Sequence, residues 1–114
     1  MKRFNDLKLK DNEKKALQEL KERILEKFPD AEIILYGSKV REDADEESDI
    51  DVLILIEEEV NTSMEDEIFH TAYDIELKYE VVFGVLVENK NFWKAPLANA
   101  MPIHWNIDKE GVPL

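Results

Sequence analysis

Residues 32–56 decide the fold of this chain; they read EIILY-GSKVR-EDADEES-DIDVLILI. Two apolar runs, residues 32–36 and 49–56, enclose a polar segment, and each has the length and composition of a buried strand. The first run stops at Gly37-Ser38, and the second opens with Asp49 and Asp51. We therefore expect two neighbouring strands of one sheet, with a glycine turn and two carboxylates at the strand ends.

Helical patterns lie on both sides of this stretch. Residues 11–28 place apolar side chains on one face at helical spacing. A second helix is expected to begin at Thr62 or Ser63, where a hydroxyl can cap it, and a third strand is expected over residues 80–87. The tail, residues 89–114, is expected to form a helical segment that packs back on the sheet.

The order of these elements predicts an α/β (α+β) fold, a small mixed β-sheet flanked by helices. The polar connection between the first two strands fits an antiparallel pair or a crossing loop, and the third strand can run in either direction. The 114 residues fit a single domain, 1–114.

The amino-acid composition argues against several classes of protein and of binding site. The net charge is -12, with 27 acidic and 15 basic residues, and an evenly acidic domain repels a polyanion. No direct nucleic acid binding is therefore expected. If the chemistry of this chain concerns nucleotides, the expected substrate is a free nucleotide with its metal ion. The chain has no cysteine, which excludes disulfides and thiolate metal sites. No apolar run approaches the roughly 20 residues of a membrane span, so we expect no membrane contact and a cytoplasmic location.

Asp49 and Asp51 carry the first chemical signal. Side chains two residues apart on a strand point to the same face, so two carboxylates are expected side by side at a strand end. Ionised carboxylates held close together repel one another, and a divalent cation relieves the repulsion. Oxygen ligands with open positions suit Mg²⁺, as one ion or as a two-ion site. A solvated strand start after an acidic loop is the plainer alternative.

The Gly37-Ser38 turn carries the second signal. A glycine at a strand end lets the backbone approach a ligand closely, and the amides after it can cradle an anion. Lys39 and Arg41 add positive charge beside this cradle, and Ser48 is placed to orient the aspartate loop. Arg41 is equally well explained as an ion-pair partner of the nearby acids, Lys39 as a solvated lysine and Ser48 as a turn residue.

Taken together, Gly37-Ser38, Arg41 three residues after the serine, and Ser48-Asp49-x-Asp51 resemble the signature of the DNA polymerase beta nucleotidyltransferase superfamily. The similarity is closest to its minimal nucleotidyltransferases, of the MntA-like antitoxin type. The resemblance implies a polymerase-beta-like fold, phosphate binding by Ser38 and metal ligation by Asp49 and Asp51.

The family also uses a third carboxylate on a later strand. By position that residue is Glu80, as catalytic group and metal ligand, with Glu76 as the fallback. The sequence departs from the family pattern here, because aspartate is more usual at this position. It departs again at Glu42, where a glycine is common.

The resemblance further implies transfer of a nucleoside monophosphate, AMP from ATP above all, to an acceptor hydroxyl. A tyrosine of a HEPN-type toxin partner is one such acceptor, with this chain as the antitoxin. Two other functions stay open: an inactive module that binds nucleotide or partner, and an enzyme that modifies a small molecule. A homo-oligomer stays open as well.

Overall fold

The computed structural model of this chain describes residues 3–41 and 49–114. Its elements, in chain order, are the 3₁₀ helix η1 (Phe4–Asp6), α1 (Asp11–Lys27), β1 (Glu32–Tyr36), α2 (Ser38–Arg41), β2 (Ile50–Ile56), α3 (Thr62–Tyr79), β3 (Phe83–Asn89), α4 (Lys90–Lys94), α5 (Pro96–Asn99), α6 (Pro102–Glu110) and β4 (Val112–Pro113). In the described part of the chain, no helix is both long enough and apolar enough to cross a membrane.

The four strands form one mixed sheet in the order β3-β2-β1-β4. β1 runs antiparallel to β2 and to β4, whereas β2 and β3 are parallel. The long helix α3 connects the two parallel strands, as parallel pairing requires. The expected mixed sheet flanked by helices is therefore confirmed, and the first two strands form the antiparallel pair.

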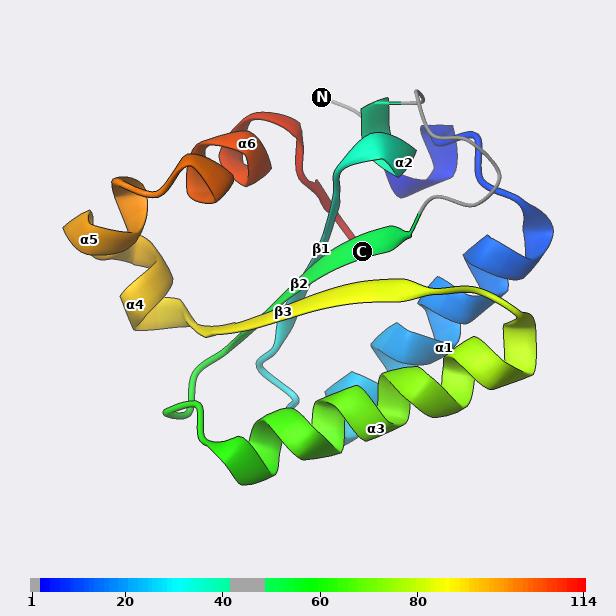
Figure 1. Cartoon of the computed structure of the whole chain (residues 1–114), viewed down its shortest axis with the longest axis horizontal. Helices are drawn as coiled ribbons and strands as arrows, with labels where there is room; N and C mark the ends of the chain where they lie inside the picture. The colour runs from blue at the N-terminus through cyan, green and yellow to red at the C-terminus, as the bar shows by residue number, and fades with distance from the viewer. Residues whose placement is uncertain (1–2, 42–48) are drawn as a thin grey trace.

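The two faces of the sheet are covered by different helices (Figure 1). Alternate residues of β2 point to opposite faces. Ile50, Val52, Ile54 and Ile56 join the large core with α1 and α3, while Leu53 and Leu55 join a smaller cluster with Trp93 and Ile107 of the C-terminal helices. Asp51 has the same parity as Leu53 and Leu55, so its side chain lies on the face of the C-terminal helices.

Three boundaries differ from the sequence predictions. Asn61 caps α3, with its side chain accepting a hydrogen bond from the Met64 amide at 2.9 Å, so Thr62 is the first helical residue. β3 begins at Phe83 rather than at residue 80, because α3 continues through Tyr79. The tail contributes the short strand β4 as well as helices, and this strand pairs with Ile34 and Leu35 of β1.

Candidate active site

The candidate site lies at one end of the sheet, where three strands bring their terminal residues into one row. Asp51 of β2 stands opposite Tyr36 of β1 and Gly84 of β3. The next row on this face is apolar, with Leu53 between Ile34 and Leu86. Asp51 is therefore the polar end of a mostly apolar sheet face.

Two glycines enclose the Asp51 carboxylate. Gly37 has φ +81°, and a Cβ atom there would lie 2.4 Å from Oδ2 of Asp51. A Cβ atom on Gly84 would lie 2.7 Å from Oδ1 of the same carboxylate. Both distances are shorter than van der Waals contact, so any side chain at either position would have to displace the carboxylate. The glycine turn and the aspartate strand consequently form one packed unit.

Gly84 was missing from the sequence-predicted site. A glycine inside a strand often marks the close approach of another group, and that signal was available in the sequence. The sequence does not show which group approaches Gly84. Only the strand register identifies that group as the carboxylate of Asp51.

Asp49 lies just before β2 and is exposed, whereas Asp51 is half-buried. Burial raises the pKa of the Asp51 carboxyl, and the negative charge of Asp49 raises it further. The Arg41 guanidinium opposes this by lowering the pKa, and Glu110 adds a smaller upward effect. The structure thus brings Asp49, Asp51, Arg41 and Glu110 into electrostatic range of one another, with an excess of negative charge.

This excess of charge suits a cation that uses few protein ligands. Among residues 3–41 and 49–114, no group of three or more histidine, aspartate or glutamate side chains is arranged to hold a metal ion. Mg²⁺ commonly takes one or two carboxylates and completes its shell with water and substrate phosphates. Asp49 and Asp51 fit that pattern, because the half-buried Asp51 carboxylate beside the charge of Asp49 is stabilised by a cation.

Glu80 does not lie where the sequence placed it. It is exposed at the C-terminal cap of α3, in the left-handed conformation with φ 57°, and it does not belong to β3. It therefore does not project from a strand beside Asp51, and the placement on a third strand was wrong. The fallback, Glu76, accepts a hydrogen bond from the Phe83 amide at 2.7 Å and so joins α3 to β3.

The residues of the Gly37-Ser38 turn have different surroundings. Ser38 is half-buried and begins α2 directly after Gly37. Lys39 is buried, and its ammonium lies 2.6 Å from a carboxylate oxygen of Glu13, which is also buried. Glu13 in turn accepts a hydrogen bond from the Lys10 amide at the start of α1. Lys39 is therefore not a solvated lysine, and its charge is committed to an ion pair between α1 and α2.

Arg41 lies beside Glu110, the last residue of α6. A guanidinium nitrogen of Arg41 is 3.0 Å from Oε1 and 3.2 Å from Oε2 of this carboxylate. The Gly37 amide donates to the same Oε1 at 3.2 Å. Glu110 was not among the predicted site residues, and 73 positions separate it from Gly37. Ser48, the remaining predicted site residue, lies outside the described residues, as does Glu42.

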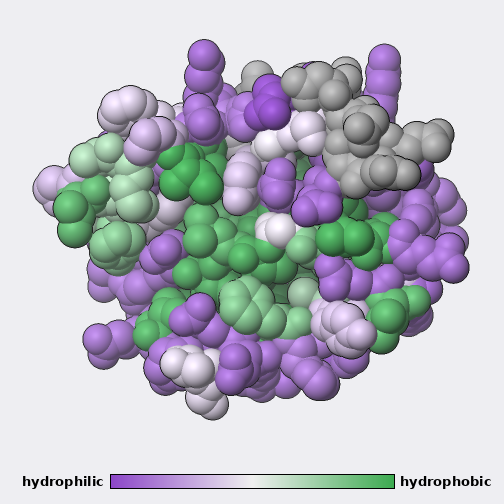
Figure 2. All heavy atoms as spheres, in the orientation of Figure 1, coloured by the Kyte–Doolittle hydropathy of each residue, from purple (hydrophilic) through white to green (hydrophobic). Residues whose placement is uncertain are grey.

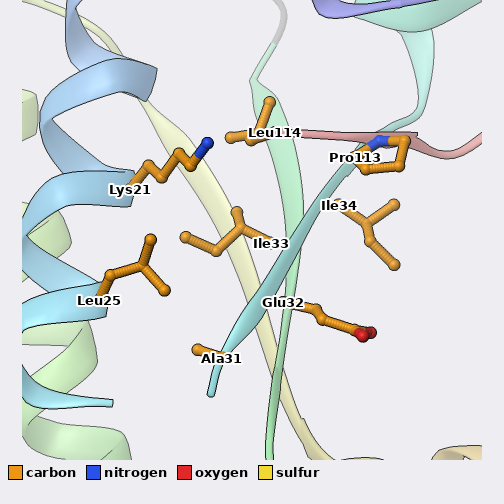
Figure 3. Close-up of a pocket in the computed structure, with 8 residues that line it drawn as sticks. All are labelled: Lys21, Leu25, Ala31, Glu32, Ile33, Ile34, Pro113 and Leu114. Carbon is orange, nitrogen blue, oxygen red and sulfur yellow. The ribbon is translucent and has the colours of Figure 1, made fainter. Parts of the chain in front are cut away.

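Of the hollows lined by residues 3–41 and 49–114, one adjoins the site and a larger one lies apart from it. A hollow of about 240 Å³ is lined by Val40, Arg41 and residues 108–112, and thus adjoins the Arg41–Glu110 pair. A hollow of about 330 Å³ lies between α1, β1 and the C-terminal residues (Figure 3), and it contains none of the site residues; its lining is Lys21, Leu25, Ala31, Glu32, Ile33, Ile34, Pro113 and Leu114.

The sheet face that carries Asp51 remains partly open. Figure 2 shows hydrophobic side chains gathered over the middle of the molecule, within a rim of hydrophilic residues. Tyr36, Leu86 and Met101 pack against the smaller core and keep partial exposure there. Burial raises the pKa of the Tyr36 hydroxyl, and the neighbouring Asp51 adds to this effect. Tyr36 is thus a neutral group beside the carboxylate.

Comparisons with known proteins agree with this geometry. Residues 17–105 match the family described as "Nucleotidyltransferase domain". Two similar proteins of Methanocaldococcus jannaschii are each named "Putative protein adenylyltransferase". One is 32% identical over 102 residues, which cover 88% of this chain and 95% of the relative. The other is 40% identical over 58 residues, which cover 51% of this chain and 59% of the relative.

The matched region includes both halves of the candidate site, from β1 and the glycine turn through the aspartates to β3. It also includes the antiparallel strands β1 and β2. The chain therefore belongs to the nucleotidyltransferases, a family of enzymes, and within them to the minimal nucleotidyltransferases of the DNA polymerase beta superfamily.

Proposed function

We propose that this chain transfers AMP from ATP, with Mg²⁺, to a hydroxyl group of an acceptor protein. The observation that carries the proposal is the enclosed Asp51 carboxylate, which lies between Gly37 and Gly84 and within electrostatic range of Asp49. This arrangement joins a pair of cation-binding carboxylates to a glycine-serine turn of the kind that receives phosphates. The names of the two relatives support adenylyl transfer to a protein.

Each side chain has a defined part in the proposed reaction. Bound Mg²⁺ would neutralise phosphate charge and position the triphosphate. Asp49 and Asp51 would hold the cation, and the Ser38 hydroxyl and the backbone of the turn would receive the terminal phosphates. The acceptor oxygen would attack the α-phosphorus, the bond to the β-phosphate would break, and pyrophosphate would leave while the acceptor proton passes to solvent.

A surface feature supports a protein acceptor. Residues 95–107 contain no aspartate, glutamate, lysine or arginine, in a chain in which 37% of the residues are charged. Leu97 and Trp105 on this segment are 72% and 59% exposed. Exposed apolar groups gathered in one place commonly mark a protein-binding surface, and α6 leads from this surface to Glu110 at the site.

The acceptor proposed from the family resemblance is a tyrosine of a HEPN-type toxin, with this chain as the antitoxin. A second candidate function is a module that binds nucleotide or partner without turnover. It is favoured by one observation, that Glu80 belongs to the cap of α3 and not to the strand β3. In the part of the chain that the structure describes, no feature favours the small-molecule alternative.

The test is calorimetric titration of Mg–ATP into the wild-type protein and into the Asp49→Asn/Asp51→Asn variant. We expect binding by the wild type and a loss of affinity of more than about 100-fold in the variant, because both cation ligands are removed. A matched control is Glu58→Gln/Glu59→Gln, which removes the same charge from exposed positions beyond the other end of β2. It should bind like the wild type.

Two results would contradict the proposal. Equal binding by the aspartate variant would place the nucleotide elsewhere. Binding without transfer to the HEPN-type partner of label from the α-phosphate of ATP would leave the binding module as the better account.

A further inference from the structure

Glu110 occupies the glycine turn with its own carboxylate. Its Oε1 accepts from the Gly37 amide at 3.2 Å and lies 3.0 Å from the Arg41 guanidinium. Its side chain is only 19% exposed, although it ends an otherwise amphipathic surface helix. An acidic side chain in this place needs an explanation, because it adds negative charge beside two aspartates.

The donors that Glu110 uses are the ones that a phosphate would use. A backbone amide and a guanidinium group bind carboxylate and phosphate oxygens by the same charge-assisted hydrogen bonds. In the proposed function, the backbone of the Gly37 turn receives the terminal phosphates of the nucleotide, and Arg41 shares the Glu110 oxygen with this turn. The carboxylate of Glu110 is therefore in the position of a competing anion.

The contact is built so that it can open. Arg41 is 49% exposed, while Glu110 is 19% exposed, so water and salt reach the pair from the arginine side and weaken it. The hollow of about 240 Å³ beside the pair offers space for a displaced Glu110 side chain.

The end of α6 does not depend on the Glu110 side chain. The Gly111 amide donates to the Ile107 carbonyl at 2.7 Å, and Val112 pairs with Leu35 of β1. These backbone bonds hold the tail in place, so Glu110 can release Gly37 and Arg41 without the tail unfolding.

We propose that Glu110 competes with the nucleotide phosphates for Gly37 and Arg41 and thereby lowers the affinity of the site for Mg–ATP. This inference rests on the proposed function, since it takes the glycine turn as the phosphate-binding site. Nucleotide binding then requires an exchange of anions: the phosphate takes over the two donors, and the carboxylate moves away toward solvent.

The test is Glu110→Gln, with Mg–ATP and magnesium tripolyphosphate as the titrants. Glutamine has the same length and can still accept from the Gly37 amide, but it carries no charge for Arg41. We expect affinity for both titrants to rise by about tenfold, in keeping with the loss of one half-exposed ion pair. Glu110→Asp, one methylene shorter, should give a smaller increase and serves if the glutamine variant does not fold.

Asp108→Asn is the matched control, because Asp108 lines the same hollow and is exposed, while its carboxylate lies 3.0 Å from Nδ1 of His104. It should bind Mg–ATP like the wild type. If both variants gained the same affinity for Mg–ATP, the loss of one negative charge would explain the effect, and the proposal would be overturned. If the wild type binds Mg–ATP and Glu110→Gln binds it equally or more weakly, Glu110 positions the turn and does not compete with the phosphates. If folded wild type and Glu110→Gln both fail to bind, the proposed function fails, and this inference with it.

Discussion

At the scale of single residues, Asp51 illustrates how a functional group costs stability. Burial and the charge of Asp49 raise its pKa, so the folded chain holds the Asp51 proton more tightly than the unfolded chain does. The ionised form therefore destabilises the fold at neutral pH, and this penalty disappears as the pH falls through the raised pKa.

Asp51→Asn should consequently be more stable than the wild type at neutral pH, since an amide is neither repelled by Asp49 nor costly to bury as a charge. We expect a gain of about 0.5 kcal/mol, or roughly 2 °C in melting temperature, because the site is only partly buried. The gain should shrink as the pH falls through the raised pKa of the wild-type carboxyl, which becomes protonated there. Thermal unfolding from neutral to acidic pH without Mg²⁺ measures it. A variant less stable than the wild type at every pH would contradict this account.

At the scale of elements, the register between β2 and β3 controls the shape of the site. Gly84 faces Asp51 across this pair, and a methyl group there would lie 2.7 Å from a carboxylate oxygen. Gly84→Ala should therefore turn the Asp51 carboxylate away and lower Mg–ATP affinity by about tenfold, as misplaced ligand geometry does. Its effect on stability should stay within about 1 kcal/mol, because alanine suits a strand better than glycine does.

Calorimetry and urea unfolding of the same samples separate the two effects. Val82→Ala is a suitable control, since Val82 is 55% exposed and precedes β3, and it should change neither quantity by much. If Gly84→Ala bound Mg–ATP as tightly as the wild type, the carboxylate position would not matter for binding.

At the scale of the whole molecule, the net charge of -12 acts on folding and on partner choice. Mutual repulsion of like charges destabilises the compact state, and salt screens it over about 10 Å at 0.1 M. Raising NaCl from about 0.02 M to 0.5 M, with a chelator present, should increase the melting temperature by roughly 3–5 °C. A constant or falling melting temperature would show that local ion pairs, such as Lys39–Glu13, outweigh the overall repulsion.

The sequence by itself determined the mixed α/β class, the strands expected at residues 32–36 and 49–56, and the candidate motifs Gly37-Ser38 and Asp49-x-Asp51 at their ends. Each of these rests on a local signal: apolar runs of strand length, a glycine at a strand end, and two acids at a spacing of two. These local patterns agree with the fold. One face of β2 is buried in the large core, so the Asp51 side chain lies on the opposite face.

Only the tertiary structure decided which distant groups meet the site. Strand register placed Gly84 against Asp51, and the return of the tail along β1 placed Glu110 on Gly37 and Arg41. The packing of α1 against α2 buried Lys39 with Glu13, and the length of α3 kept Glu80 off the third strand. These positions depend on contacts between residues far apart in the chain, and local spacing does not encode such contacts.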